Sequence, residues 1–572
     1  MHKKEKKRIA KKKYLYFNFL IKYTLKKRLL LKYIIIVAAI ICSSYVSIIQ
    51  PEYQKKIIDQ LTNVHKTKLL NIITNVILFL MLILVNYLLT YLQRYIQIIV
   101  SEDIAEDLRN TVNAKLTKIQ SIYFSKNNLS DVLLKSDKNI QIIKQSGIIS
   151  LITLITNLIL LLCVIPHMFY IHNGITILTI ILICMIPIST KIIGLHIKRA
   201  TKKVLDSYKK ITDILNCSYK NWINIRIFQC TDYICNKYAV ENRTYKKNVN
   251  EQNELYILNT IMSAIFVLLG ISAIWIWGTN DVYHGNMTIG TIFALINYQT
   301  TMTSPILGIS SFANDYHTSY EAMNDFIEFM NLPDYNESGI ILNECPKEII
   351  LENVSFRYDN SDFDVFSNVN IRFEQGKTYY FIGNSGQGKS TLFNLIIGFL
   401  HPTQGRILID GYDLREINLC SYWKSIGYVM QNSYFFFDTI KQNIDLTNSL
   451  NEDVICSMAD ELNLMDTINN SKDGFHTIIK EDSSNFSGGQ LKRFDILRNI
   501  LKNPGLLILD EGTSNVETTL KERIHIILQR YFKNSIVICS THDKNELVNA
   551  DIIYIISNKH IEAVERYEDK CS

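Results

Sequence analysis

The fold of the second half of the chain is decided by Gly383-Asn-Ser-Gly-Gln-Gly-Lys-Ser390, the phosphate loop. It matches the pattern Gly-x-x-x-x-Gly-Lys-[Ser/Thr]. A predicted buried strand, Thr378–Ile382, precedes it, and a predicted helix, Thr391–Ile397, follows it. In this context the backbone N–H groups and the helix N-terminus both favour an anion, so the loop is expected to cradle phosphate. A chance glycine turn is the alternative, and the flanking elements argue against it.

The predicted ATP site is built on this loop. Lys389 would reach the β- and γ-phosphates, and Ser390 would ligate Mg²⁺. The residues predicted to bind ATP here are Gly383, Asn384, Ser385, Gly386, Gln387, Gly388, Lys389, Ser390 and Thr391.

Composition and charge set further limits. The 572 residues are 48% hydrophobic and carry a net charge of +7, with thirteen Lys or Arg in Met1–Lys32. This basic run is interpreted as an orientation signal against anionic lipid rather than a nucleic-acid site, because membrane spans follow directly. The eleven cysteines include no C-x-x-C pair, so neither a disulfide framework nor a zinc site is predicted.

Six apolar runs precede residue 310, and each is near the ~20 residues needed to span a bilayer. A soluble protein can bury one such helix, but six predict a membrane domain. The runs are Leu29–Ile49, Leu69–Leu92, Ile148–Phe169, Ile171–Ile193, Leu255–Trp277 and Met287–Ile309.

Basic residues predict the orientation of these spans. The long loops Glu102–Gln145 and Lys191–Leu255 carry seven and thirteen Lys or Arg, whereas the short loops after the third and fifth runs carry none. The positive-inside rule therefore places both termini and both long loops in the cytoplasm. Apolar residues recur at helical spacing through Ile104–Ile122 and Val204–Ile227, so the spans are expected to continue there as helices.

Few charges lie within the spans, but the second and sixth are rich in polar and aromatic residues. These side chains would either line a polar cavity or form helix–helix hydrogen bonds and interfacial anchors. The sequence leaves both possibilities open for Tyr87, Tyr91, Tyr95, Asn297, Tyr298 and Gln299.

Composition changes after Met330, and short apolar strands then alternate with helices, which predicts an α/β nucleotide-binding domain. The predicted domains are a basic cytoplasmic segment (1–28), a six-helix transmembrane domain (29–330), a linker (331–347) and the nucleotide-binding domain (348–572). The predicted strands are Ile349–Phe356, Thr378–Ile382, Gly427–Met430, Leu506–Asp510, Ser535–Ser540 and Ile552–Ile556.

The strand Leu506–Asp510 ends in two acids, Asp510 and Glu511. Asp510 is predicted to hold Mg²⁺, and Glu511 stands where a base would polarise the attacking water. Phosphoryl transfer depends mainly on positioning and charge neutralisation, which these groups would supply.

The segment Phe486-Ser-Gly-Gly-Gln490 precedes a basic helix, Leu491–Ile500, and resembles the signature motif of ATP-binding-cassette proteins. The resemblance implies that Tyr358 stacks on adenine, that Gln431 senses the γ-phosphate and contributes to the metal site, and that His542 contacts the γ-phosphate. A core tyrosine, a surface glutamine and a strand-end histidine are the ordinary alternatives, but the ordered set argues against them. The resemblance also implies that four residues of this segment contact the ATP held by the partner subunit: Ser487, Gly488, Gly489 and Gln490.

The first half resembles the exporter type of the same family, in which a six-helix transmembrane domain precedes the ATPase. The fold class implied is an α-helical membrane domain followed by an α/β phosphate-loop domain. The stretches that carry this resemblance are Gln50–Asp59, Tyr123–Asp131, Lys220–Phe228 and Gly285–Gly290, with Tyr298 and Pro305.

Several positions depart from the family pattern without removing a group needed for hydrolysis. Phe486 replaces the signature leucine, and Glu517 replaces an aspartate of the D-loop, where the extra methylene is expected to loosen communication between two ATP sites. The other departures are Ser130, Ser483 and Gly512.

One phosphate loop and one signature imply a dimer, either of identical chains or with a related half-transporter, in the cytoplasmic membrane. The expected activity is ATP-driven export. A peptide or bacteriocin-like cargo is the first expectation, because a Tyr-rich, weakly charged cavity suits amphipathic peptides; a lipid or hydrophobic drug is the alternative. A cargo peptide would be processed elsewhere, since the first span begins by residue 29. The competing hypotheses are a non-transporting regulator or channel, and a soluble ATPase acting on nucleic acid or ribosomes.

Overall fold

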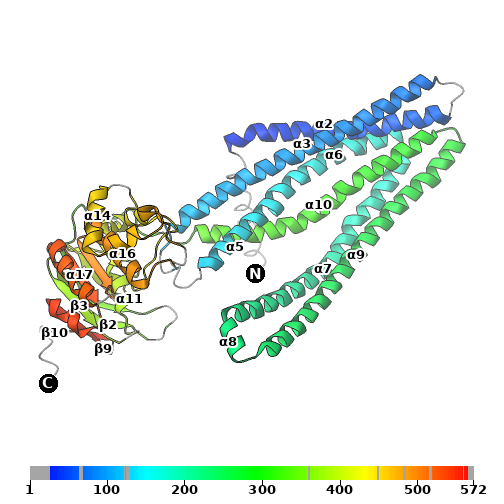
Figure 1. Cartoon of the computed structure of the whole chain (residues 1–572). Coiled ribbons are helices and arrows are strands. Elements are labelled where there is room, and N and C mark those ends of the chain that lie inside the picture. Colours follow the sequence, from blue (N-terminus) through cyan, green and yellow to red (C-terminus); the bar gives the residue numbers. More distant parts are fainter. Residues whose placement is uncertain are drawn as a thin grey trace. The chain divides into compact units, whose positions relative to one another are not determined.

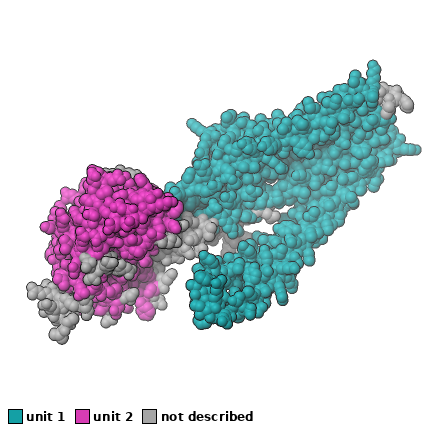
Figure 2. Space-filling model, in the orientation of Figure 1, with its two compact units in different colours: residues 1–117, 130–332 teal, residues 118–129, 333–572 magenta. Residues whose placement is uncertain are grey.

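The computed structural model describes residues 23, 26–62, 68–120, 123, 129–358, 361, 363–384, 386–447, 450–480, 485–513, 518–557 and 559–564. Predictions for Ser385, Ser483 and Glu517 and for most of Tyr123–Asp131 lie outside these residues. The chain divides into two compact units (Figure 2). Unit 1 comprises residues 1–117 and 130–332, and unit 2 comprises residues 118–129 and 333–572.

Unit 1 consists of long helices, and the predicted apolar runs lie almost entirely within them (Figure 1). Its elements are α2 (Lys27–Thr62), α3 (Leu69–Leu116), α5 (Leu129–Ile142), a π-helical turn (Ile143–Ile149), α6 (Ser150–Ile171), α7 (Asn173–Lys220), α8 (Trp222–Ile227), α9 (Thr231–Tyr283) and α10 (Ile289–Met330). The helical continuation expected over Ile104–Ile122 is present as far as Leu116, where α3 ends. The one expected over Val204–Ile227 is divided between α7 and α8.

These helices pack as a bundle in which α10 contacts α2, α6, α7 and α9. Helices α7 and α9 run along each other, with α8 joining them at one end (Figure 1). Polar side chains also connect neighbouring helices. Gln93 of α3 donates to Thr156 Oγ1 at 2.9 Å, and Gln97 donates to the carbonyl of Ile149 at 3.0 Å. Such hydrogen bonds support helix association where lipid removes the hydrophobic driving force.

Among the described residues, five helices are long and apolar enough to cross a membrane: α2, α3, α7, α9 and the continuous helix Ser136–Ile171. Helix α10 contains the sixth predicted run but falls short in apolar character. The polar stretch Asn297–Thr301 accounts for this lower apolar character. Two of its residues, Tyr298 and Gln299, are fully buried among neighbouring helices.

Unit 2 contains two β-sheets. One is a four-stranded antiparallel sheet in the order β2-β1-β4-β5. The other has the order β10-β9-β3-β8-β7-β6 and is parallel except for β10. The strands are β1 (Glu348–Phe356), β2 (Phe366–Glu374), β3 (Thr378–Ile382), β4 (Gln404–Ile409), β5 (Tyr412–Asp413), β6 (Ile426–Val429), β7 (Leu506–Asp510), β8 (Ile536–Ser540), β9 (Ile552–Ser557) and β10 (His560–Val564).

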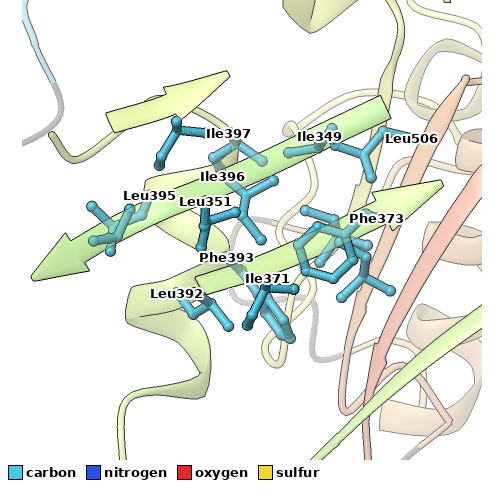
Figure 3. Close-up of a cluster of buried hydrophobic side chains, with 14 of the residues drawn as sticks. Ile349, Leu351, Ile371, Phe373, Leu392, Phe393, Leu395, Ile396, Ile397 and Leu506 are labelled. Atoms are coloured by element: carbon cyan, nitrogen blue, oxygen red, sulfur yellow. The ribbon is translucent and has the colours of Figure 1, made fainter. Parts of the chain in front are cut away.

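Two functional segments of unit 2 lie at the starts of helices. Helix α11 follows the phosphate loop, and α16 begins in the signature segment. Figure 3 shows part of the hydrophobic core, in which α11 contributes Leu392, Phe393, Leu395 and Ile396 to a cluster with strands β1 and β2. The helices are α11 (Lys389–Ile396), α12 (Leu419–Lys424), α13 (Ile440–Ile444), α14 (Glu452–Glu461), α15 (Met465–Asn469), α16 (Gly488–Leu501) and α17 (Thr518–Tyr531), with short 3₁₀ turns at Gly474–His476 and Lys544–Asn549.

Candidate functional site

The phosphate loop connects β3 to α11 and requires glycine at two described positions. Gly386 and Gly388 have φ values of +83° and +102°, which residues with a Cβ rarely adopt. A Cβ at Gly388 would also lie 2.7 Å from Phe366 Cζ. The backbone N–H of Asn384 donates to Gln387 Oε1 at 2.8 Å and folds the loop onto itself.

Lys389 is the first residue of α11, and its side chain folds back over the phosphate loop. Its Nζ donates to the carbonyl of Gly383 at 2.6 Å and lies 3.2 Å from His542 Nε2. Burial lowers the pKa of Lys389, while the charges of Glu511 and Asp510 act in the opposite direction. The ammonium group is thus held inside the loop, where it would meet an entering phosphate.

Asp510 is buried at the end of β7, where two hydroxyl groups bind its carboxylate. Ser390 Oγ donates to Asp510 Oδ2 at 2.6 Å, and Ser540 Oγ donates to Asp510 Oδ1 at 2.8 Å. The structure therefore brings together Ser390 and Asp510, the first two predicted metal ligands. Sequence reasoning missed Ser540, although its place at the end of a buried strand, two residues before His542, was an available signal.

Glu511 follows Asp510 and lies in the left-handed region, with φ of +49°. Such a backbone costs about 1–2 kcal/mol for a residue other than glycine. Its N–H donates to Ser540 Oγ at 2.9 Å. Gln431 Nε2 donates to Glu511 Oε2 at 3.0 Å, and His542 Nε2 lies 3.2 Å from Glu511 Oε1. The three side chains predicted to act in catalysis therefore meet in this structure.

Tyr358 lies beside the start of α11, at the edge of this cluster. Its hydroxyl is 3.1 Å from Thr391 Oγ1, and its ring packs edge-on against Phe356, with the ring centroids 4.9 Å apart. The residue is 37% exposed. A partly exposed ring close to the phosphate loop is compatible with the predicted stacking on adenine.

The signature segment lies at the start of α16. Ser487 Oγ accepts a hydrogen bond from Gln490 N at 3.2 Å, while Gln490 Oε1 accepts from Ser487 N at 2.8 Å. This reciprocal pair is a capping box, which stabilises a helix N-terminus. Ser487 and Gly488 remain exposed. Within the described residues no hydrogen bond joins Ser487–Gln490 to the phosphate loop, so a single chain does not bring these two predicted parts together.

The structure separates the polar residues predicted in the spans into two groups. Tyr298 donates to the carbonyl of Ile48 at 2.7 Å, Gln299 donates to that of Val267 at 2.9 Å, and Asn297 donates to Gln54. These contacts match the helix–helix alternative. The tyrosines of α3 instead remain more than half exposed: Tyr87, Tyr91 and Tyr95.

Comparisons with known proteins match both halves of the chain. The family model described as ABC transporter transmembrane region matches residues 33–306, and the model described as ABC transporter matches residues 366–514. An ATP-dependent lipid A-core flippase of Syntrophus aciditrophicus is 27% identical over 453 residues, covering 78% of this chain and 75% of the relative. A second relative, from Bacillus subtilis, is described as a multidrug export ATP-binding/permease protein. It is 25% identical over 465 residues, and the match covers 79% of each chain.

The fold is similar to a solved structure of a bacterial Atm1-family ABC exporter with ATP bound. The TM-score is 0.83, with 20% sequence identity, and the match covers 94% of this chain and 96% of the other. At this identity the likeness establishes the fold, a helical membrane domain followed by an α/β nucleotide-binding domain of the type I exporter. Since family models match both halves in the same order, the chain belongs to the ABC transporters, as an exporter half-transporter whose ATPase domain couples ATP hydrolysis to transport.

Proposed function

We propose that ATP binds with its phosphates in the phosphate loop and is hydrolysed by the groups gathered around the ends of β6, β7 and β8. One observation carries this proposal: a continuous set of contacts runs from Lys389 through His542 and Glu511 to Gln431. Four side chains from separate segments converge there, as phosphoryl transfer requires.

The donor set at Ser390 and Asp510 suits Mg²⁺. Magnesium prefers oxygen ligands, and the hydroxyl and the carboxylate are already in hydrogen-bond contact. Gln431, the third predicted ligand, contacts Glu511 in this structure. When bound, Mg²⁺ would neutralise phosphate charge as the bond to the leaving group breaks.

The protein groups would act on the attacking water and on the γ-phosphate. Glu511 would accept a hydrogen bond from the water, while Gln431 and His542 keep its two carboxylate oxygens oriented. Lys389 would move from the carbonyl of Gly383 to the β- and γ-phosphates. Tyr358 would stack on adenine, and Ser487–Gln490 of a second chain would cover the same nucleotide.

A half-transporter fold implies a dimer, and we propose that both termini of each chain lie in the cytoplasm. The charge distribution supports this orientation, because Lys and Arg concentrate in the N-terminal run and in the two long loops. ATP binding would bring the two ATPase domains together and turn the helical domain from inward- to outward-facing.

We propose a lipid or hydrophobic drug as the cargo, rather than the peptide first expected from the sequence. Named relatives at similar distance act on lipid A-core or are assigned to multidrug export. The helical unit also exposes a largely apolar surface with interspersed tyrosines on α3, which suits amphiphiles that enter from the bilayer.

Replacing Glu511 with glutamine tests the catalytic proposal. We expect Glu511→Gln to bind ATP normally but to hydrolyse it at least about 100-fold more slowly, because the amide is a far weaker proton acceptor. The exposed Glu416→Gln serves as the matched control. Hydrolysis near the wild-type rate in Glu511→Gln would remove Glu511 from the mechanism.

Transport is tested in inverted vesicles with fluorescent phospholipid analogues and hydrophobic dyes. ATP-dependent accumulation that disappears with Glu511→Gln would support an exporter of amphiphiles. A protein that hydrolyses ATP but moves neither these probes nor a panel of peptides would instead indicate a regulator or a channel.

A further inference from the structure

Gln431 lies in the segment that follows β6. Side chains of α16 donate hydrogen bonds to the backbone of this segment. Lys492 Nζ donates to the carbonyl of Met430 and, at 3.1 Å, to that of Gln431. Further along the same helix, Arg498 Nη1 donates to the carbonyl of Tyr434 at 3.0 Å. Helix α16 therefore determines where this backbone lies.

Lys492 is unusual among these contacts because it buries a charge. The residue is 3% exposed, and both of its acceptors are backbone carbonyls at the turn that presents Gln431. Burial lowers the pKa of Lys492, while the charges of Asp495, Asp510 and Glu511 favour the ammonium form. A buried cation is costly unless its hydrogen bonds are satisfied, so its removal would release the backbone it holds.

The position of Lys492 along α16 connects two parts of the ATPase site. It lies one helical turn after Gly488, within the stretch that the capping box of Ser487 and Gln490 stabilises. The ammonium group of Lys492 contacts the backbone of Gln431, and the side chain of Gln431 donates to Glu511 at 3.0 Å. A displacement of the signature segment would thus reach the Glu511 carboxylate through Lys492 and Gln431.

We infer that Lys492 is a positioning residue that couples the signature segment to Gln431 and, through it, to Glu511. Because the signature segment is proposed to cover ATP held by the partner, Lys492 would make hydrolysis at one site sensitive to nucleotide at the other. The inference rests on the proposed role of Gln431. It assigns a specific side chain to communication between the two ATP sites.

The test compares Lys492 of α16 with Lys502, the residue that directly follows this helix. Lys492→Met keeps the apolar stem and removes the donor. In the reconstituted full-length dimer we expect kcat for ATP hydrolysis to fall about tenfold or more, with KM within about twofold, because the lost contact orients catalytic groups rather than binding ATP. The Hill coefficient for ATP should fall toward one, whereas Lys492→Arg should retain part of both properties.

Lys502→Met controls for the loss of a lysine that binds two backbone carbonyls, although Lys502 itself is exposed. Lys502 Nζ also donates to two backbone carbonyls, at 2.8 Å to Trp423 and at 2.5 Å to Ile426, but these precede β6 or begin it. We expect its kcat and Hill coefficient to remain near wild type. Equal losses in both methionine variants would indicate a general structural role and overturn the inference.

A double-mutant cycle identifies the route. If Lys492 acts through Gln431, combining Lys492→Met with Gln431→Ala should lower kcat no further than Gln431→Ala alone. Additive losses would contradict the inference. Wild-type kcat in Gln431→Ala would refute the role of Gln431 and, with it, the proposed coupling of Lys492 to Glu511. The proposal that Glu511 acts in ATP hydrolysis would be unaffected by that result. Should Lys492→Met fail to fold, Lys492→Gln and Lys492→Arg provide the same comparison.

Discussion

Gly388 is the residue at which the phosphate loop is most tightly constrained. Its φ of +102° is unfavourable for a residue with a side chain, and a Cβ would collide with Phe366. This position therefore requires glycine, because the backbone must turn tightly before α11 begins.

We predict that Gly388→Ala lowers stability by about 1–3 kcal/mol, the usual cost of a strained backbone, and weakens ATP binding strongly. Thermal unfolding and binding of a fluorescent ATP analogue measure the two effects. Gly411→Ala is the matched control, because Gly411 has a similar φ of +85° but open space around it. It should lose some stability yet bind ATP normally. Equal loss of binding in both variants would contradict this account.

At the scale of elements, an ion-pair network joins α17 to the backbone beyond β7 and β8. Lys521 Nζ lies 3.0 Å from Asp543 Oδ2 and 3.4 Å from Glu546 Oε1, and Thr513 Oγ1 donates to Glu546 at 2.6 Å. Asp543 is adjacent to His542. One lysine therefore holds together the segments that follow two catalytic positions.

We predict that Lys521→Met destabilises the protein by about 3 kcal/mol, because it leaves the buried Glu546 carboxylate without its cation. Chemical unfolding of the ATPase unit in the full-length chain measures this loss. The exposed pair of Lys377 and Glu374 provides the control, and Lys377→Met should cause no measurable change. A loss no larger than that of the control would show that Lys521 is not needed to compensate Glu546.

The same network predicts a pH dependence. Lys521 lowers the pKa of Asp543 below its ordinary 3.8, first through a direct hydrogen bond. A carboxyl group with a lowered folded-state pKa stabilises the protein above its unfolded pKa and loses that contribution as pH falls through the folded value. The difference in the free energy of unfolding between wild type and Lys521→Met should therefore stay constant from about pH 5 to 8. It should shrink below about pH 4, where Asp543 becomes protonated. A difference that changed mainly near neutral pH would implicate another group.

For the whole molecule, the separation of the phosphate loop from the signature segment determines the assembly. Each chain supplies one of each, and the described residues show no hydrogen bond between them. Two chains would form two sites, each with a phosphate loop from one chain and a signature segment from the other.

We predict that two inactive variants restore hydrolysis when they are co-assembled. Lys389→Ala disables the phosphate loop, and Ser487→Arg disables the signature segment. A mixed dimer keeps one intact site, so random assembly should recover up to about a quarter of wild-type activity, and less if hydrolysis at one site requires nucleotide at the other. The control co-assembles wild type with a chain carrying both changes, since their mixed dimers contain no intact site. Equal activity in the two mixtures, after correction for wild-type dimers, would contradict a shared site.

Much of unit 2 was predictable from the sequence. The six predicted strands correspond within a residue to β1, β3, β6, β7, β8 and β9. The continuous apolar runs of β7 and β8 reflect burial on both faces of the parallel sheet, whereas β1 alternates between more and less buried residues. Strands β2, β4, β5 and β10 were not predicted, because their alternating polar residues form strands only when the correct antiparallel neighbour is in register.

The membrane unit shows a similar division. Apolar length predicted the helices, because a span must satisfy its own backbone hydrogen bonds. It did not predict which polar residues face other helices. Tyr298 and Tyr87 have the same side chain, yet one is fully buried and hydrogen-bonded to Ile48, and the other is 75% exposed. That difference arises from helix rotation and packing, which local sequence does not specify.

The sequence by itself determined the phosphate loop, the acids at the end of β7 and the family, because these depend on residues adjacent in the chain and on the backbone geometry they permit. Only the tertiary structure decided the contacts of Ser540, the burial of Lys492 and the meeting of Gln431, Glu511 and His542. These contacts join residues far apart in sequence, and their strength comes from burial and directional hydrogen bonds that exist only after the strands and helices have packed.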